Sequence, residues 1–180
     1  MALAHAVMSL LAKKAYSGYE IGKEFEDSVG YFWQATHQQI YRELKKLEEQ
    51  GWVSVEAIAQ GKPLDKKIYH LTELGQQKLA EWIDEECELG PIREDILVKV
   101  FAGKLVSPQV LLQHLEQNRR LHLKRLEAYK EIEKRLFAHP EELSYGELCQ
   151  YMVLKMGICC EKAWNSWCEE SIEVLQNVKE

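Results

Sequence analysis

The sequence lacks the features that mark secreted, membrane-spanning and disulfide-stabilised proteins. Its five cysteines are odd in number and include no Cys-x-x-Cys spacing, which argues against a disulfide framework and against a zinc site. An apolar run near the N-terminus, LAHAVMSLLA, is too short to span a bilayer, and lysines follow it instead of preceding it. We therefore expect a cytoplasmic protein with no membrane segment.

The signatures of catalysis are also missing. There is no Gly-x-Ser-x-Gly, no P-loop, no Gly-x-Gly-x-x-Gly after a strand and no His-Glu-x-x-His. No set of His, Cys, Asp and Glu residues has the spacing of metal ligands, and the carboxylate pairs are most simply surface charge. We predict that the protein is not an enzyme and that it holds no metal and no cofactor.

What the sequence contains changes in character near residue 90. Before this point the segments are short and are separated by glycine and proline, whereas long helical patterns with few breaks follow it. We predict a mainly α protein with a small β-hairpin. Its expected domains are residues 1–88, which are compact, and residues 89–180, which form long helices.

The pattern of the first domain is typical of a winged helix-turn-helix. The spacing of apolar residues predicts three helices, and Ser17 and Thr36 begin capping boxes at the second and third. WVSVEAIA and KKIYHL predict two strands joined by the polar loop AQGKPLDK, and Thr72 begins a closing helix. Three helices, a hairpin and a closing helix in this order define the winged fold.

The third predicted helix, within QATHQQIYRELKKLEEQGWV, carries the candidate DNA contacts. One apolar edge faces the other helices, and the far side bears amides and cations. Glutamine and arginine pair with base edges, whereas tyrosine and lysine suit phosphates. Together with the lysines of the expected wing, the predicted DNA-binding residues are Thr36, His37, Gln38, Gln39, Tyr41, Arg42, Lys45, Lys46, Lys62, Lys66, Lys67 and Tyr69.

The protein has little positive charge for a partner of DNA. Its formal net charge is -6, and residues 34–69 hold six basic and five acidic side chains. Binding would therefore depend on a locally sorted face and would be sensitive to salt. Two other interpretations stay open: a merely solvated surface helix, and a winged helix that binds a protein partner without contacting DNA.

Two linked motifs resemble the PadR family of bacterial transcriptional regulators. The first is Tyr-x-x-Leu-x-x-Leu-x-x-x-Gly in HQQIYRELKKLEEQGWVSVE, and the second is Tyr-x-Leu-Thr-x-x-Gly in KKIYHLTELGQQKLAEW. PIREDILVKVFAGKLVSPQVLLQHLEQ resembles the helical dimerisation domain of the long-form members, which are related to the virulence activator. The expected wing, GKPLDKKIY, is longer than is common in the family and carries Asp65. The resemblance implies a homodimeric regulator, often released from DNA by a small molecule.

Two long helices are predicted in the second domain, over residues 108–137 and 145–178. Helices of this length are not buried by the first domain, so we expect a second copy to cover them and to form a dimer on a palindromic operator. The predicted dimer-interface residues are Leu115, His122, Leu126, Tyr129, Leu148, Met152, Met156, Cys159 and Trp167.

A pocket for a small aromatic effector is a further hypothesis for the second domain. Trp, Met, Tyr and Cys side chains between the bundle and the winged domain could line it, although the simpler interpretation is dimer core. His122 is expected to be a hydrogen-bonded core residue and not a metal ligand. The cysteines could report oxidation, but buried thiols are normally inert.

Overall fold

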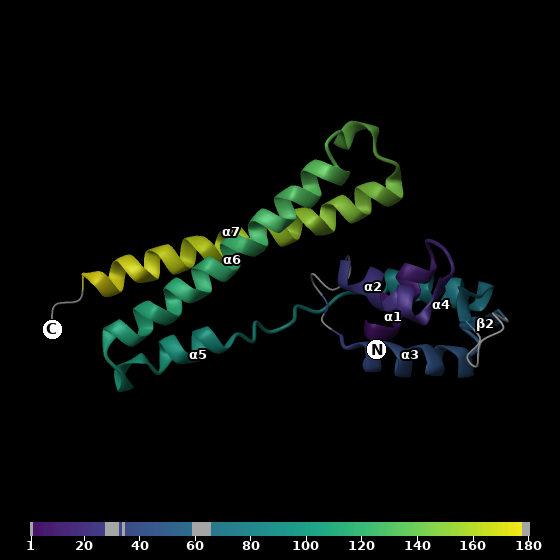
Figure 1. Cartoon of the computed structure of the whole chain (residues 1–180), viewed down its shortest axis with the longest axis horizontal. Coiled ribbons are helices and arrows are strands. Elements are labelled where there is room, and N and C mark those ends of the chain that lie inside the picture. Colours follow the sequence, from purple (N-terminus) through teal and green to yellow (C-terminus); the bar gives the residue numbers. More distant parts are fainter. Residues whose placement is uncertain (1, 28–32, 34, 59–65, 178–180) are drawn as a thin grey trace. The chain divides into compact units, whose positions relative to one another are not determined.

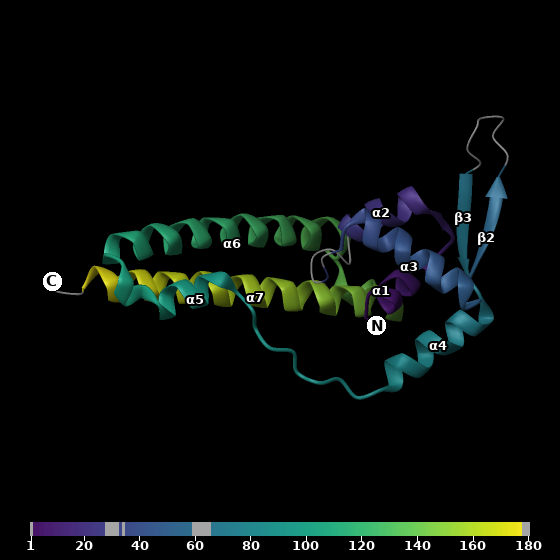
Figure 2. The ribbon, with the colours of Figure 1, turned by 90° about the horizontal axis from the view of Figure 1, so that it is seen from below.

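The computed structural model describes residues 2–27, 33, 35–58 and 66–177. The chain forms two compact units, Met1–Leu89 and Gly90–Glu180, and each is described by itself. The elements of the first unit are α1 (Ala2–Leu11), β1 (Tyr16–Ser17), α2 (Gly18–Asp27), α3 (His37–Glu49), β2 (Val53–Ile58), β3 (Lys66–Leu71) and α4 (Glu73–Asp84). Figures 1 and 2 label all of these except β1.

The first unit is a winged helix-turn-helix. Its antiparallel sheet has the order β1-β3-β2, and Tyr69 of β3 pairs with Tyr16 on one side and Val55 on the other. Figure 2 shows the β2–β3 hairpin extending away from the helices of this unit. The predicted hairpin is confirmed, and the two-residue strand β1 adds a third strand that the sequence pattern did not predict.

Apolar residues from α1, α2 and α3 form the core of this unit. Spacing of three or four residues places them on one side of each helix, and burial of that side holds the three helices together. The side chains buried to 2 % exposure or less on these helices are Val7, Met8, Leu10, Ile21, Phe25, Ile40, Leu44 and Leu47.

The junction between α3, β2 and α4 explains the Gly and Thr of the two motifs. Gly51 has a φ of +71°, a left-handed conformation that ends α3. The Thr72 hydroxyl lies 2.8 Å from the Gly51 carbonyl oxygen and accepts a 3.0 Å hydrogen bond from the Gly75 amide. A Cβ atom on Gly75 would lie 2.1 Å from the Trp52 carbonyl oxygen, so only glycine fits there.

The second unit is a long antiparallel helical hairpin with a short helix beside it (Figures 1 and 2). Its elements are α5 (Asp95–Phe101), the 3-10 turn η2 (Gly103–Leu105), α6 (Pro108–Leu136), the 3-10 turn η3 (Pro140–Glu142) and α7 (Tyr145–Gln176). A capping box between Ser144 and Glu147 fixes the start of α7. The predicted extension of α7 to Val178 lies outside the described residues.

Two apolar clusters hold the helices of the second unit together. Ile96, Leu115 and Ile172 form the cluster that includes α5, and Leu126, Tyr129 and Ile158 form another along α6 and α7. The Tyr129 ring lies close to Gly157, where a Cβ atom would be 2.9 Å from Tyr129 Cε2. α5 was not predicted as a separate helix.

Candidate nucleic-acid interface

The outer face of α3 is polar and exposed, as predicted from the sequence. Thr36, Gln38, Gln39, Tyr41 and Arg42 are all exposed, while the opposite edge of the helix is buried. Within the part of the chain that the structure describes, neither Gln38 nor Arg42 has a side-chain hydrogen bond or ion pair. Arg42 is therefore a cation whose donors are available to an external acceptor.

A reciprocal capping box fixes the start of α3. The Gln39 amide donates to Thr36 Oγ1 at 3.2 Å, and the Thr36 amide donates to Gln39 Oε1 at 2.8 Å. The Thr36 hydroxyl also donates to Gln39 Oε1, at 3.1 Å. These bonds satisfy amides that a helix start leaves unpaired, and they hold the Gln39 side chain in place.

Two glycines of α2 lie in close contact with two ring side chains of α3. A Cβ atom on Gly18 would lie 2.4 Å from Tyr41 Cε1, and one on Gly22 would lie 2.3 Å from His37 Nδ1. Gly18 and Gly22 are four residues apart on α2, and His37 and Tyr41 are four residues apart on α3. The two glycines therefore form one flat surface, the glycine shelf, against one edge of α3. His37, predicted as a DNA contact, lies against this shelf, and Tyr41 keeps an exposed face beside it.

Carboxylates neutralise the lysines on the α3 surface. Lys46 Nζ lies 3.1 Å from Glu43 Oε2, and Lys45 Nζ lies 3.8 Å from Glu49 Oε1. Such exposed pairs contribute little to stability and are easily exchanged for other partners. The two lysines are therefore available to phosphates only in competition with their own carboxylates.

The lysine at the start of β3 is paired across the fold. Lys66 Nζ lies 3.3 Å from Glu20 Oε1, and Glu20 Oε2 accepts hydrogen bonds from the Ser17 amide and hydroxyl. The Ser17 bonds and then Lys66 lower the pKa of Glu20 from 4.5 to about 2. Lys67 is exposed and has no ion pair among the described residues, whereas Lys62 and Asp65 lie outside them.

Tyr69 differs from its predicted role as a DNA contact. Only 7 % of the residue is exposed, because its side chain belongs to the apolar core that α1, α2 and α3 form. Burial, followed by the charge of Glu48, raises the pKa of the Tyr69 hydroxyl above its ordinary value. Tyr69 is a core residue of the wing and not part of the exposed face.

The predicted dimer-interface residues of the second unit fall into two groups. Those on α6 pack inside the chain's own helical hairpin, where Leu115, Leu126 and Tyr129 are buried. On α7, Met152 is 57 % exposed and Met156 is 64 % exposed. Leu148 and Cys159 are also exposed, so together these four form an outward apolar stripe. Trp167 is half-buried and lies edge-on to Trp164.

His122 belongs to a buried polar cluster between α6 and α7, in agreement with its expected hydrogen-bonded role. Its Nδ1 atom lies 2.6 Å from Glu161 Oε2, and Arg125 donates to Glu161 Oε1 at 3.3 Å. Trp164 stacks on the His122 ring at 5.2 Å between centroids. Sequence reasoning missed Glu161 and Arg125, because neither lies in a local motif with His122.

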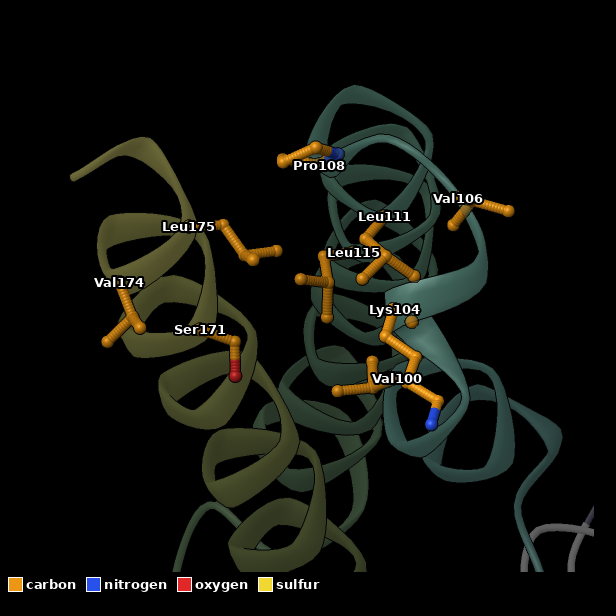
Figure 3. A pocket seen from close by; sticks show the side chains of 10 residues that line it. Val100, Lys104, Val106, Pro108, Leu111, Leu115, Ser171, Val174 and Leu175 are labelled. Carbon is orange, nitrogen blue, oxygen red and sulfur yellow. The ribbon is translucent and has the colours of Figure 1, made fainter. Parts of the chain in front are cut away.

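A pocket of about 440 Å³ opens in the second unit between α5, η2, α6 and α7. Figure 3 shows Leu175 of α7 pointing toward Leu111 and Leu115 of α6. Its lining is mostly aliphatic, with Lys104 and Ser171 as polar members and none of the Trp, Met, Tyr or Cys residues expected of an effector pocket. Cys168 is buried, and that burial raises the pKa of its thiol.

No group of three or more His, Cys, Asp or Glu side chains among the described residues is arranged to hold a metal ion. None of the helices formed by the described residues is both long and apolar enough to cross a membrane.

The first unit is thus a winged helix with an exposed polar face on α3, joined in sequence to a helical hairpin. Two family models match the chain: the Transcriptional regulator PadR-like family over residues 7–81 and Virulence activator alpha C-term over residues 92–176. A probable transcriptional regulator of Mycobacterium tuberculosis is 40 % identical, over 98 % of both chains. The negative transcriptional regulator PadR of Bacillus subtilis is 32 % identical, over 96 % of this chain and 97 % of its own. The chain belongs to the PadR family of transcriptional regulators.

Solved structures agree with this assignment. Bacillus subtilis PadR in complex with operator DNA has a TM-score of 0.86 and 28 % identity, covering 97 % of this chain and 99 % of that one. The Vibrio cholerae virulence activator AphA has a TM-score of 0.79 and 30 % identity, covering 97 % and 98 %. Bacillus subtilis PadR in complex with p-coumaric acid has a TM-score of 0.78 and 27 % identity, covering 98 % and 96 %. The predicted fold class and family are confirmed.

Proposed function

We propose that this regulator binds double-stranded DNA sequence-specifically as a homodimer on a palindromic operator, represses transcription, and is released by a small aromatic effector. The observation that carries the proposal is the outer face of α3, where Gln38 and Arg42 are exposed and have no partner among the described residues. In helix-turn-helix proteins the N-terminal residues of the second helix of the motif contact base edges in the major groove.

The chemistry of the α3 face supports direct reading of bases. Arg42 offers paired donors that match guanine O6 and N7, and Gln38 offers a donor and an acceptor that match adenine. Tyr41, Lys45 and Lys46 flank these side chains and suit phosphates. The relative with a TM-score of 0.86 was solved with operator DNA, which supports the same use of this face here.

The exposed stripe on α7 supports a homodimer. Leu148, Met152, Met156 and Cys159 recur every three or four residues and face outward from the chain's own hairpin. A continuous apolar stripe is costly to leave in water and is characteristic of an interface. A two-fold dimer would present two α3 helices to half-sites about 34–36 Å apart, which suits a palindrome.

Repression and release by an effector rest on the relatives. The Bacillus subtilis relative is named as a negative regulator, and its structure with p-coumaric acid shows that protein with a small aromatic acid. We propose a flat aromatic ligand for this chain as well. Titration of phenolic acids into a preformed protein–DNA complex tests release from DNA. Aliphatic acids of equal charge are the control.

DNA binding is tested by fluorescence anisotropy with DNA from upstream of the protein's own gene, against scrambled DNA, at two salt concentrations. Preferential binding that weakens steeply with salt supports the proposal, and equal, feeble binding to both DNAs contradicts it. Arg42→Ala should cost about 1–3 kcal/mol on the cognate site. Arg120→Ala, which removes an exposed charge from the second unit, is the matched control and should leave the preference for cognate DNA unchanged.

The dimer is tested by sedimentation of Met156→Glu, which places a charge in the middle of the α7 stripe. Val110→Glu, on an exposed position of α6, is the control. Loss of dimer in the first variant alone supports the proposed interface. A Met156→Glu protein that still sediments as a dimer contradicts it.

A further inference from the structure

The two glutamines at the start of α3 are chemically different, although the sequence makes them look alike. Gln39 Oε1 accepts two hydrogen bonds, from the Thr36 amide at 2.8 Å and from the Thr36 hydroxyl at 3.1 Å. An amide oxygen has two lone pairs, so the acceptor capacity of Gln39 is used inside the protein. Gln38 has no such bond among the described residues.

The orientation of the Gln39 amide is fixed by its neighbour. The backbone N–H of Thr36 can only donate, so the atom facing it must be the oxygen and not the nitrogen of the side-chain amide. The Nε2 group therefore carries two N–H donors that no hydrogen bond within the described residues uses. Gln39 is exposed, so these donors are open to a partner outside the chain.

A glutamine held in this way cannot read adenine in the usual manner. That pairing needs the side-chain oxygen to accept from adenine N6 while the nitrogen donates to N7. With its oxygen occupied, Gln39 offers donors alone, and the major-groove edge of guanine presents two adjacent acceptors, N7 and O6. The adenine N6 amino group would instead face the donors of Gln39 without a hydrogen bond.

We propose that Gln39 is a donor-only specificity residue that selects guanine over adenine at one position of each half-site, while Gln38 keeps the ordinary preference for adenine. This inference rests on the proposed use of α3 as the reading helix. The same arrangement links specificity to folding, because the capping bonds that start α3 also orient the reading group.

Gln39→Glu is the sharpest variant. A glutamate at this position keeps the capping box, since its carboxylate accepts the same two bonds, but it removes both N–H donors. Gln50→Glu is the matched control, because it adds the same charge at the far end of α3, outside the predicted DNA contacts, without removing the Gln39 donors. Thermal unfolding of both variants shows that neither change acts through loss of the fold.

The experiment first selects an operator for the wild-type protein from a random duplex library. Each guanine of the selected half-site is then replaced by 7-deazaguanine, which lacks the N7 acceptor, and binding is measured for all three proteins. At one guanine we expect the replacement to weaken the wild type and Gln50→Glu by about 5- to 10-fold. Gln39→Glu should bind the two duplexes equally.

The outcomes separate this inference from the function on which it rests. If the wild type selects no sequence, the proposed function fails and the assignment of Gln39 fails with it. If the wild type selects a sequence but Gln39→Glu responds to every 7-deazaguanine as the wild type does, only the assignment of Gln39 is wrong. The assignment is also wrong if the base that Gln39 contacts proves to be an adenine and binding requires the N6 amino group of that adenine.

Discussion

The ring of Tyr41 lies against Gly18, and this contact sets how closely the two helices of the helix-turn-helix approach. A Cβ atom on Gly18 would lie 2.4 Å from Tyr41 Cε1, and His37 is related to Gly22 in the same way. The exposed face of α3 is thus positioned by α2 through residues that have no side chain. The polar residues beside Tyr41 depend on this shelf for their place.

Substitution of Gly18 by Ala should therefore destabilise the protein and displace α3. We expect a loss of about 1–3 kcal/mol in the free energy of unfolding, as for other overpacked sites, because the ring must move away. Gly146→Ala is the control, since a Cβ atom there would meet nothing within 4 Å. Urea denaturation measures both, and equal stabilities of the two variants would contradict the role given to the shelf.

The bond network of Glu20 predicts a stability that depends on pH. The pKa of Glu20 is lowered from 4.5 to about 2 by Ser17 and Lys66, so its contribution is present above pH 4.5 and is lost as the pH falls toward 2. Glu20→Gln should cost at most about 1 kcal/mol at pH 7, because the pair with Lys66 is partly exposed.

Urea denaturation of the wild type and Glu20→Gln at pH 7 and pH 3 measures this contribution. The difference between the two proteins should shrink at the lower pH. Glu88→Gln, at an exposed position outside the helices, is the control and should show no such dependence. A difference that stays constant from pH 7 to pH 3 would rule out Glu20 as its source.

Local patterns in the sequence predicted α3 and β3 but not the ion pairs between distant elements. The Thr36–Gln39 capping box and the bounds of β3 follow from residues close in sequence, and the structure confirms both. The Lys66–Glu20 pair joins residues 46 positions apart and leaves no local signal. The burial of Tyr69 was not predicted, because its ring packs in a core built by helices that are distant in sequence from β3.

Long helices with apolar residues on several sides limit prediction in a different way. The stripe of α7 predicted to face a second copy, through Met152 and Met156, faces outward in the chain, whereas residues of α6 predicted for the same interface are buried inside the chain's own hairpin. The side that packs on α6 carries Ile158, Glu161 and Cys168, two of which are not aliphatic. Periodicity shows that such a helix has an apolar face, but it does not decide which of two neighbouring faces meets which partner.

The carboxylates of α3 are expected to restrain binding to DNA of any sequence. Glu49 lies 3.8 Å from Lys45, so Glu49→Gln should release this lysine for phosphate. We expect affinity to rise by a similar factor for cognate and scrambled DNA, and the slope of log K against log salt to steepen by about 0.9. Anisotropy titrations across salt concentrations measure both quantities.

Glu127→Gln is the control for this prediction, because it removes one exposed negative charge from the second unit and changes the net charge equally. An identical gain in both variants would assign the effect to net charge instead of to the released lysine. A gain for cognate DNA alone would show that Lys45 contacts a base and not the backbone.

The buried carboxylate of Glu161 should be the most sensitive polar group of the second unit. It is 5 % exposed and accepts from Arg125, and His122 lies at its other oxygen. Removing the carboxylate leaves the His122 ring nitrogen without a partner, while Arg125, whose side chain is 53 % exposed, stays solvated, so Glu161→Ala should lower the free energy of unfolding by about 1–3 kcal/mol. Glu173→Ala, exposed on the same helix, should change it little.

An apolar pair can replace a buried polar one, so Glu161→Leu combined with His122→Leu should recover part of the stability lost in Glu161→Ala. Calorimetry of the wild type, the two single variants and the double variant measures this recovery. A double variant less stable than Glu161→Ala would mean that His122 stabilises the hairpin through its stacking on Trp164 and not through Glu161.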